Sequence, residues 1–151
     1  STVHTNSAAG AIQRLRDMGI EPYVLAATLK AVIAQRLVRR LCEHCRKPHE
    51  PTDDELAMFG LTREQAPQLW RPVGCMACGN SGYVGRQGVY ELITIDSQLR
   101  DLIRADASED AIQEQALSNF GTLFRNAARF VVTGETSVEE VLRVCRREDE
   151  H

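Results

Sequence analysis

Two pairs of cysteines constrain the fold of this chain more than any other feature of its sequence. The pairs are Cys42-Glu-His-Cys45 and Cys75-Met-Ala-Cys78, and 29 residues separate them. A C-x-x-C segment directs both sulfurs at one ion, and two such segments complete the tetrahedral four-sulfur shell in which proteins hold structural zinc. We therefore predict a structural Zn²⁺ bound by Cys42, Cys45, Cys75 and Cys78. Such a closed shell keeps no position for water, so it favours a structural role over a catalytic one.

Other uses of these residues remain open at this point. Disulfides, free thiols and a redox site are the alternatives for the four cysteines, although five cysteines without a secretory signal fit a reducing compartment better. His44 and His49 are possible substitutes for a sulfur ligand, but with four cysteines available we expect both to be exposed. Arg46 and Lys47 follow the first pair and either offset the charge of a zinc–thiolate centre or remain solvated. Cys145 falls in an apolar helical stripe, where we expect a small core residue.

The composition indicates a globular protein with an aliphatic core. Of the 151 residues, 43% are hydrophobic and only 5% are aromatic. No apolar run approaches the roughly 18 residues that a membrane span needs. The formal net charge of −3 argues against a general nucleic-acid binder, which needs clustered cations. Tyr83 and Tyr90 are therefore expected to belong to a glycine-rich turn and a strand, and not to a base-stacking surface.

Helical patterns dominate the chain. Asn6 or Ser7 is expected to cap a helix that Gly19 ends, and the spacing of apolar residues predicts one long helix from Pro22 to Leu41. Arg36, Arg39 and Arg40 would form one basic face of that helix, facing solvent, a nucleotide, acidic lipid or another subunit. Further helices are expected at 97–105, 108–119, 122–133 and from 137, and possible capping boxes begin at Thr52, Thr62 and Ser137.

The strand pattern is limited to 89–95, after a glycine-rich stretch at 79–88 that is expected to turn sharply. We predict a predominantly helical α/β fragment in which N-terminal strands of the sheet are missing. An incomplete sheet leaves free edges, so we also expect the isolated chain to self-associate.

Several motifs in one order carry a resemblance to a known family. The motifs are Ser1-Thr-Val-His-Thr-Asn-Ser-Ala8, Arg14-Leu-Arg-Asp-Met-Gly19, Ala34-Gln-Arg-Leu-Val-Arg-Arg-Leu-Cys42, Gly74-Cys-Met-Ala-Cys78, Gly82-Tyr-Val-Gly-Arg86, Gly88-Val-Tyr-Glu-Leu92 and Gly134-Glu-Thr-Ser-Val-Glu-Glu-Val-Leu-Arg143. Together they resemble the second half of a secretion ATPase, most closely the cytoplasmic E-subunit ATPase of type II secretion and next the type IV pilus assembly ATPase. The segment after Asn119 departs from the family pattern.

The resemblance implies a RecA-like ATPase domain in a hexamer that drives pseudopilus or pilus assembly and protein export from the cytoplasmic side of the bacterial inner membrane, with platform proteins of that membrane as partners. It implies that His4 belongs to a His box near the γ-phosphate, and it makes Arg36 and Arg39 candidate nucleotide contacts. ATP and Mg²⁺ are expected only in the full-length protein. This chain has no G-x-x-x-x-G-K-[ST] loop, so alone it is expected not to hydrolyse ATP.

The resemblance also implies a domain plan. Residues 1–41 would be the distal part of the RecA-like domain, 42–80 a tetracysteine zinc insertion, 81–95 a returning strand, and 96–151 a C-terminal helical subdomain. Two other functions stay open: a free-standing zinc-ribbon adaptor for protein or nucleic acid, and a zinc hydrolase. Tight, salt-sensitive binding of DNA or RNA would favour the adaptor. Three sulfurs and one water on the metal would favour the hydrolase.

Overall fold

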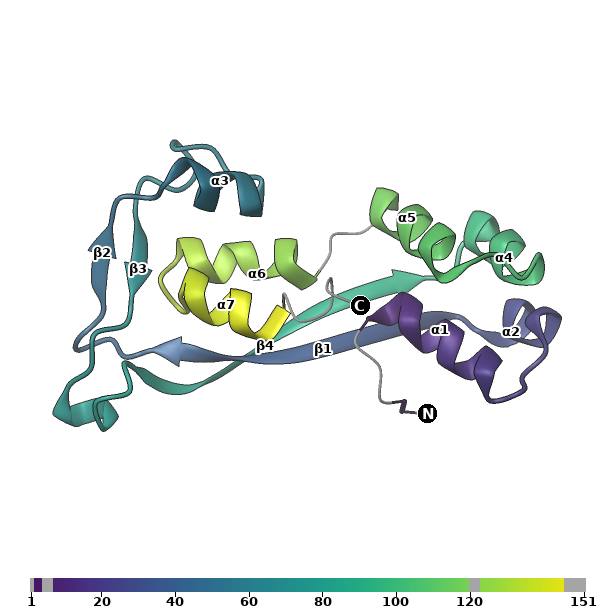
Figure 1. Cartoon of the computed structure of the whole chain (residues 1–151), viewed down its shortest axis with the longest axis horizontal. Coiled ribbons are helices and arrows are strands. Elements are labelled where there is room, and N and C mark those ends of the chain that lie inside the picture. Colours follow the sequence, from purple (N-terminus) through teal and green to yellow (C-terminus); the bar gives the residue numbers. More distant parts are fainter. Residues whose placement is uncertain (1, 4–6, 120–122, 146–151) are drawn as a thin grey trace. The chain divides into compact units, whose positions relative to one another are not determined.

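The chain forms an α/β fragment of two compact units. The computed structural model describes residues 2–3, 7–119 and 123–145, which contain seven α-helices and four strands (Figure 1). One unit comprises Ser1–Ala34 and Tyr90–Thr122, and the other Gln35–Val89 and Leu123–His151. Strand β1 (Ala31–Leu41) pairs with β4 (Tyr83–Thr94), and both strands continue from one unit into the other. No described helix combines the length and hydropathy that crossing a membrane requires.

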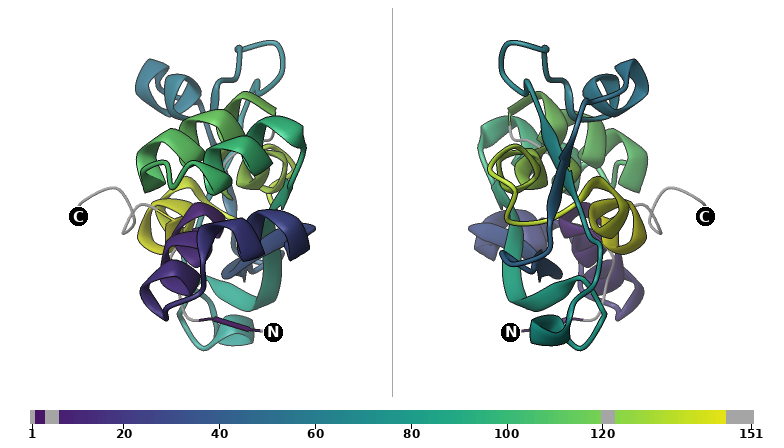
Figure 2. Two further views of the ribbon diagram at one scale, coloured as in Figure 1. Left: turned by 90° about the vertical axis from the view of Figure 1, so that its right-hand side faces the viewer. Right: turned by 90° about the vertical axis from the view of Figure 1, so that its left-hand side faces the viewer.

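The first unit packs four helices around an aliphatic core. These are α1 (Ala8–Asp17), α2 (Pro22–Thr28), α4 (Ser97–Arg104) and α5 (Glu109–Asn119). Helix α4 packs against α2 and α5, and α5 also packs against α1 (Figure 2). The buried side chains at the centre of this core are Ala8, Ala9, Ile12, Leu25, Ala26, Ile93, Ile95, Leu99, Ile103, Ile112 and Ala116.

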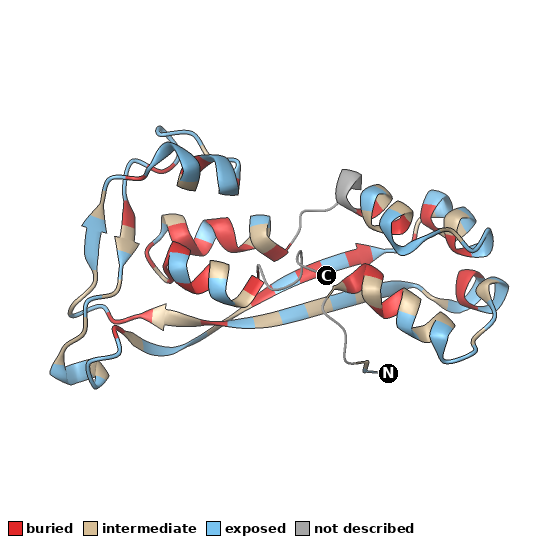
Figure 3. Ribbon diagram, viewed as in Figure 1, coloured by how far each residue is buried: buried red, intermediate tan, exposed pale blue. Residues whose placement is uncertain are grey.

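The second unit holds the cysteines. It contains α3 (Asp53–Phe59), α6 (Leu123–Val132), α7 (Val138–Cys145), the short strands β2 (Lys47–His49) and β3 (Leu69–Arg71), and the single turn η1 (Met76–Cys78). Strands β2 and β3 pair antiparallel. Helix α6 packs against α7, and both helices contact β3. Phe59 of α3 stacks on Phe124 of α6 with 4.5 Å between ring centroids. Buried residues accordingly lie along α6 and α7 (Figure 3).

The helix predicted from Pro22 to Leu41 is confirmed as far as Thr28 and is wrong beyond it. Helix α2 ends at Thr28, Leu29 is extended, and Ala31–Leu41 is strand β1. The strand prevails because β-branched residues favour it and because pairing with β4 satisfies its backbone. That pairing joins segments distant in sequence, which a local apolar spacing does not reveal. The basic face of a helix predicted from Arg36, Arg39 and Arg40 is therefore wrong as well, since side chains alternate along a strand.

Two smaller predictions also need correction. The strand expected at 89–95 begins at Tyr83, so residues 83–88 of the glycine-rich stretch are extended instead of turning. At Thr62, the capping hydrogen bonds with Gln65 do form, but only a single turn follows. Pro67 explains the early end, because a proline disfavours helical backbone at the residue before it. The helices expected at 97–105 and 108–119 are confirmed, as are those expected at 122–133 and from 137.

The capping box at the start of α3 gives a testable stability effect. The Thr52 hydroxyl accepts from the Glu55 N–H at 3.1 Å, and the Glu55 carboxylate accepts from the Thr52 N–H at 3.0 Å. We expect Thr52→Ala to lower the free energy of unfolding by about 1 kcal/mol, as for other N-caps. Urea unfolding measures the effect. Thr62→Ala is the matched control, because the same pair of bonds there begins no helix, and an equal loss in both variants would contradict the assignment.

Candidate metal centre

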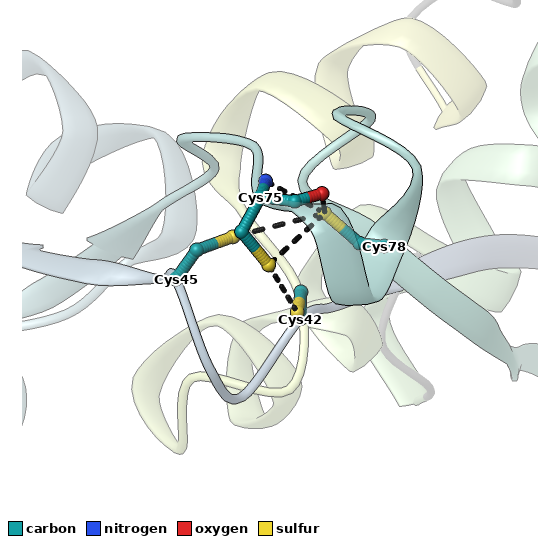
Figure 4. A group of neighbouring side chains, drawn as sticks. All are labelled: Cys42, Cys45, Cys75 and Cys78. Carbon is teal, nitrogen blue, oxygen red and sulfur yellow. Dashed lines mark hydrogen bonds between the residues drawn. The ribbon is translucent and has the colours of Figure 1, made fainter.

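The four predicted cysteines converge on one point (Figure 4). Their sulfurs all lie within 4.8 Å of one another. Cys42 Sγ lies 3.8 Å from Cys75 Sγ, Cys45 Sγ lies 3.9 Å from Cys78 Sγ, and the sulfurs of Cys75 and Cys78 are 3.7 Å apart. A tetrahedral zinc site with Zn–S bonds of about 2.3 Å has edges of about 3.8 Å, whereas a disulfide is about 2.05 Å long. The quartet therefore fits one tetrahedral ion and contains no disulfide.

Backbone N–H groups point at the sulfurs. Gly74 donates to Cys45 Sγ at 3.3 Å, and Cys75 and Gly82 both donate to Cys78 Sγ at 3.2 Å. A side chain at position 82 would not fit, because a Cβ there would lie 2.5 Å from the Pro72 Cβ and the backbone has φ +82°. Glycine at position 82 therefore allows the close approach to Pro72 in which its backbone N–H reaches the Cys78 sulfur.

These donors favour a thiolate at Cys78. Burial acts to raise the pKa of Cys78, but the hydrogen bonds from the Cys75 and Gly82 backbones outweigh it and lower the pKa to about 6. At Cys75 the backbone contact with Cys78 acts to lower the pKa. Burial and the sulfurs of Cys78 and Cys42 raise it overall, to about 11. Because thiolates are the form that binds metal, the lowered pKa of Cys78 favours ligation at neutral pH, and a cation would favour the thiolate of Cys75 as well.

The two nearby histidines lie outside the cluster. His44 is exposed, and His49 places Nε2 3.3 Å from the Glu55 carboxylate. Within the described ranges, the four cysteines are the one group of three or more potential ligands that converge on a point. Cys145 is buried on α7, away from this group. The expectation that His49 is exposed needs a correction, since its pairing with Glu55 leaves the side chain only 28% exposed.

A stacked pair joins the metal arm, which we define as residues 42–82, to the turn between α6 and α7. Arg46, the residue after the second cysteine, stacks its guanidinium on Trp70 at 4.4 Å and donates to the Gly134 carbonyl at 2.7 Å. Gly134 has φ +78°, and a Cβ there would lie 2.7 Å from both Arg46 Nη1 and Trp70 Cδ1. Only glycine combines that backbone conformation with that close contact.

A buried carboxylate ties β1 to α7 in the same unit. Glu140 has no exposed side-chain surface. It accepts from the Arg39 backbone N–H at 3.0 Å, from the Arg39 guanidinium at 2.8 Å and from Arg143 at 2.7 Å. Burial acts to raise the pKa of Glu140, but the hydrogen bonds from Arg143 and Arg39 prevail and lower it to about 2. The carboxylate is therefore charged at every physiological pH.

Tyr83 completes the contact between the end of the metal arm and α7. Its hydroxyl lies 2.7 Å from the Ser137 hydroxyl, which also accepts from the Glu140 N–H as the N-cap of α7. The Arg39 guanidinium packs over the Tyr83 ring at 4.2 Å. The capping box predicted at Ser137 is thus only half formed, because the Glu140 side chain turns to Arg39 and Arg143.

The residues that the sequence proposed for a nucleotide site are His4, Arg36 and Arg39. His4 lies outside the described residues. Arg36 and Arg39 are three apart on β1, so they point to opposite faces of the strand. Arg40 pairs with Glu135 at 3.6 Å. Arg46, Trp70, Glu140 and Tyr83 were not anticipated as a contact set. Gly134 was the one signal of this contact in the sequence, because a glycine directly after an apolar helical pattern indicates the end of a helix.

Comparison with known proteins places the chain in a family. The family model described as "Type II/IV secretion system protein" matches residues 1–143. The Type II secretion system protein E of Aeromonas hydrophila is 47% identical over 148 residues, which are 98% of this chain and 30% of that protein. The Type II secretion system ATPase E of Vibrio cholerae is 40% identical over 146 residues, covering 97% of this chain and 29% of that protein.

A pilus protein matches too. The Type IV pilus assembly ATPase PilB of Thermus thermophilus is 41% identical over 145 residues, which are 94% of this chain and 16% of that protein. The chain therefore spans about a third or less of the length of the curated relatives that it matches.

Proposed function

The chain belongs to the type II/IV secretion system protein family, and from this we propose that it is part of a motor ATPase that powers pseudopilus or pilus assembly and protein export. The observation that carries the proposal is the match to the family model over residues 1–143, together with identities of 40% or more to a type II secretion ATPase and a pilus assembly ATPase. These relatives are at least three times longer, so the motor activity belongs to a longer protein.

The four-cysteine site is proposed to hold a structural Zn²⁺. The tetrahedral spacing of the sulfurs and the N–H groups that point at them support this, as does the composition of the group, in which all four ligands are cysteines. When bound, the ion would cross-link the two ends of the metal arm. The arm would then present a fixed surface for subunit or partner contacts.

The domain plan is also part of the proposal. Residues 1–41 and 81–95 would belong to the distal part of a RecA-like domain, 42–80 to the zinc insertion, and 96–151 to a C-terminal helical subdomain. His4, Arg36 and Arg39 would serve the nucleotide site of the full-length protein, where ATP and Mg²⁺ bind. Of the two arginines, Arg39 is already held by Glu140, which fits a fixed position for its charge.

Assembly and location follow from the same family membership. We propose a hexamer of the full-length protein, peripheral to the cytoplasmic face of the bacterial inner membrane and in contact with platform proteins there. No nucleic-acid partner is proposed. The chain alone is proposed not to hydrolyse ATP, since its sequence has no phosphate-binding loop.

A chimera tests the proposed function. The matched segment of the Aeromonas hydrophila protein is replaced by this chain and expressed in a strain that lacks the native gene. We expect secretion to be restored, because 47% identity over nearly the whole chain should preserve the contacts of the motor. The same exchange in Thermus thermophilus PilB, scored by pilus assembly, separates a secretion motor from a pilus motor. A chimera that accumulates normally in both strains but restores neither process would contradict the proposal.

A further inference from the structure

The metal site lies beside two hydrogen bonds that hold the turn between α6 and α7. Arg46 directly follows the ligand Cys45 and donates to Gly134. Leu41 directly precedes the ligand Cys42 and donates its N–H to the Glu135 carbonyl at 2.8 Å. Two of the four cysteines are thus next to a residue that bonds to this turn. A third, Cys78, accepts from Gly82, and the next residue, Tyr83, pairs with Ser137.

The turn itself depends on those contacts. Thr136 and Ser137 are 0% and 2% exposed, and each hydroxyl bonds to a residue of β1 or β4 near an end of the arm. The Thr136 hydroxyl donates to the Arg39 carbonyl at 2.8 Å, and the Ser137 hydroxyl pairs with Tyr83. Displacement of these ends of β1 and β4 would leave buried hydroxyls without partners, which is costly.

A bound metal ion would link the two ends of the arm to each other. Cys42 donates its N–H to the Gly82 carbonyl at 2.9 Å, so the two ends of the arm meet at the ligands. Without a cation no bond joins the four sulfurs, which lie within 4.8 Å of one another, and the ends of the arm lose the link that fixes Arg46 and Tyr83. We infer that metal occupancy of the four-cysteine site is coupled to the order of α7, through the Arg46–Trp70–Gly134 contact and the Tyr83–Ser137 pair.

This inference rests on the metal centre proposed above and adds a consequence outside the arm. Helix α7 supplies no metal ligand, yet its N-cap hydroxyl is shared with Tyr83. Loss of metal should therefore lower the local stability of α7. Helix α4 in the other unit contacts α2 and α5, and its local stability should not change. A metal ion bound in the arm would thereby stabilise helix α7.

Hydrogen exchange of the full-length protein tests the coupling. Amide exchange is compared before and after a chelator removes the metal, and again after Zn²⁺ is restored. We expect amides of α7 (Val138–Cys145) to exchange about tenfold faster without metal, because local opening free energies set exchange rates. Amides of α4 (Ser97–Arg104) should be unchanged, and Zn²⁺ should reverse the effect.

Two variants separate coupling from metal binding. Tyr83→Phe keeps the ring beneath Arg39 but removes the hydroxyl, and Gly134→Ala displaces Arg46 and Trp70. Both should retain metal by elemental analysis, yet show fast exchange in α7 with metal bound. Hydroxyl-radical labelling of Trp70 should rise in Gly134→Ala. Tyr23→Phe, at a tyrosine 65% exposed on α2, is the control and should behave as the unmodified protein.

The outcomes are distinct. If the protein binds metal but amide exchange in α7 stays the same after the metal is removed, the coupling is overturned and the proposed metal centre still stands. An equal rise in α4 and α7 would also overturn it, because that result reports global unfolding. Protein isolated without chelators and found to hold no metal would instead contradict the zinc site of the proposed function.

Discussion

Cys75→Ser is expected to abolish metal binding and to unfold the metal arm. Structural zinc contributes an apparent 10–16 kcal/mol or so in zinc-finger peptides, which is as large as the roughly 5–15 kcal/mol net stability of a whole domain. Residues 42–82 bury only a few apolar side chains besides the cysteines, among them Leu56, Phe59, Ala66 and Leu69, and their regular elements are α3, two strands of three residues each and the single turn η1. The metal-to-protein ratio should fall from one to zero. Backbone amides of the arm should lose their protection from hydrogen exchange.

A control in the same C-x-x-C segment isolates the role of the sulfur. Met76 lies between the two ligands and is 96% exposed, so Met76→Ser changes the sequence of the segment without removing a ligand or a buried contact. It should retain one metal ion and a protected arm. Metal content that falls equally in both variants, or an arm that stays protected in Cys75→Ser without metal, would contradict the assignment of the ligands.

Glu140→Gln is expected to lower the free energy of unfolding by about 2–3 kcal/mol. The change keeps the shape of the side chain but replaces charge-assisted hydrogen bonds, each worth roughly 1.5–3 kcal/mol, by neutral ones. Removal of one partner from a buried ion pair typically costs about 3–5 kcal/mol. The smaller figure applies here because Arg39 and Arg143 are 43% and 56% exposed and can turn to solvent. Urea unfolding near pH 7 measures the loss.

The neighbouring residue provides the matched control. Glu139 carries the same side chain on the same turn of α7 but is exposed, so Glu139→Gln should change stability by no more than about 0.5 kcal/mol. If the two substitutions cost the same, Glu140 does not hold β1 and α7 together. The result would then contradict the buried pairing described here.

The same carboxylate sets a pH dependence. Its pKa is lowered to about 2 in the folded chain from the ordinary 4.5, so its contribution to stability is complete above pH 4.5 and is lost as the pH falls toward 2. Acid also protonates the cysteines and releases metal, but it does so in both proteins. The difference in stability between the unmodified chain and Glu140→Gln should therefore shrink from pH 5 to pH 2, and a constant difference would contradict the low pKa.

The metal ligands were predictable because their geometry is local. A C-x-x-C segment places two sulfurs together whatever the rest of the fold does, so the spacing of Cys42, Cys45, Cys75 and Cys78 sufficed to predict that they converge. The short C-terminal helices were predictable for a related reason. Caps such as Asp96 and Ser137 and the stop at Gly134 act within one turn of helix.

Strand β1 and the Glu140 contacts were not predictable in the same way. Apolar residues in Ala31–Leu41 occur at spacings that fit a helix, and the partner that makes the segment a strand is more than forty residues away. Glu140 lies three residues after Ser137, which is the signature of a capping box. Its side chain instead reaches Arg39, 101 residues earlier in the chain, because a guanidinium is a stronger partner for a buried carboxylate than one more amide.

X-ray absorption at the zinc edge, on full-length protein purified without chelators, tests the central claim most directly. The account predicts one zinc per chain surrounded by four sulfurs at about 2.3 Å, with no lighter atom in the first shell. A shell that contains nitrogen or oxygen, or protein that holds no zinc while Cys42, Cys45, Cys75 and Cys78 are oxidised or freely alkylated in a folded chain, would contradict it.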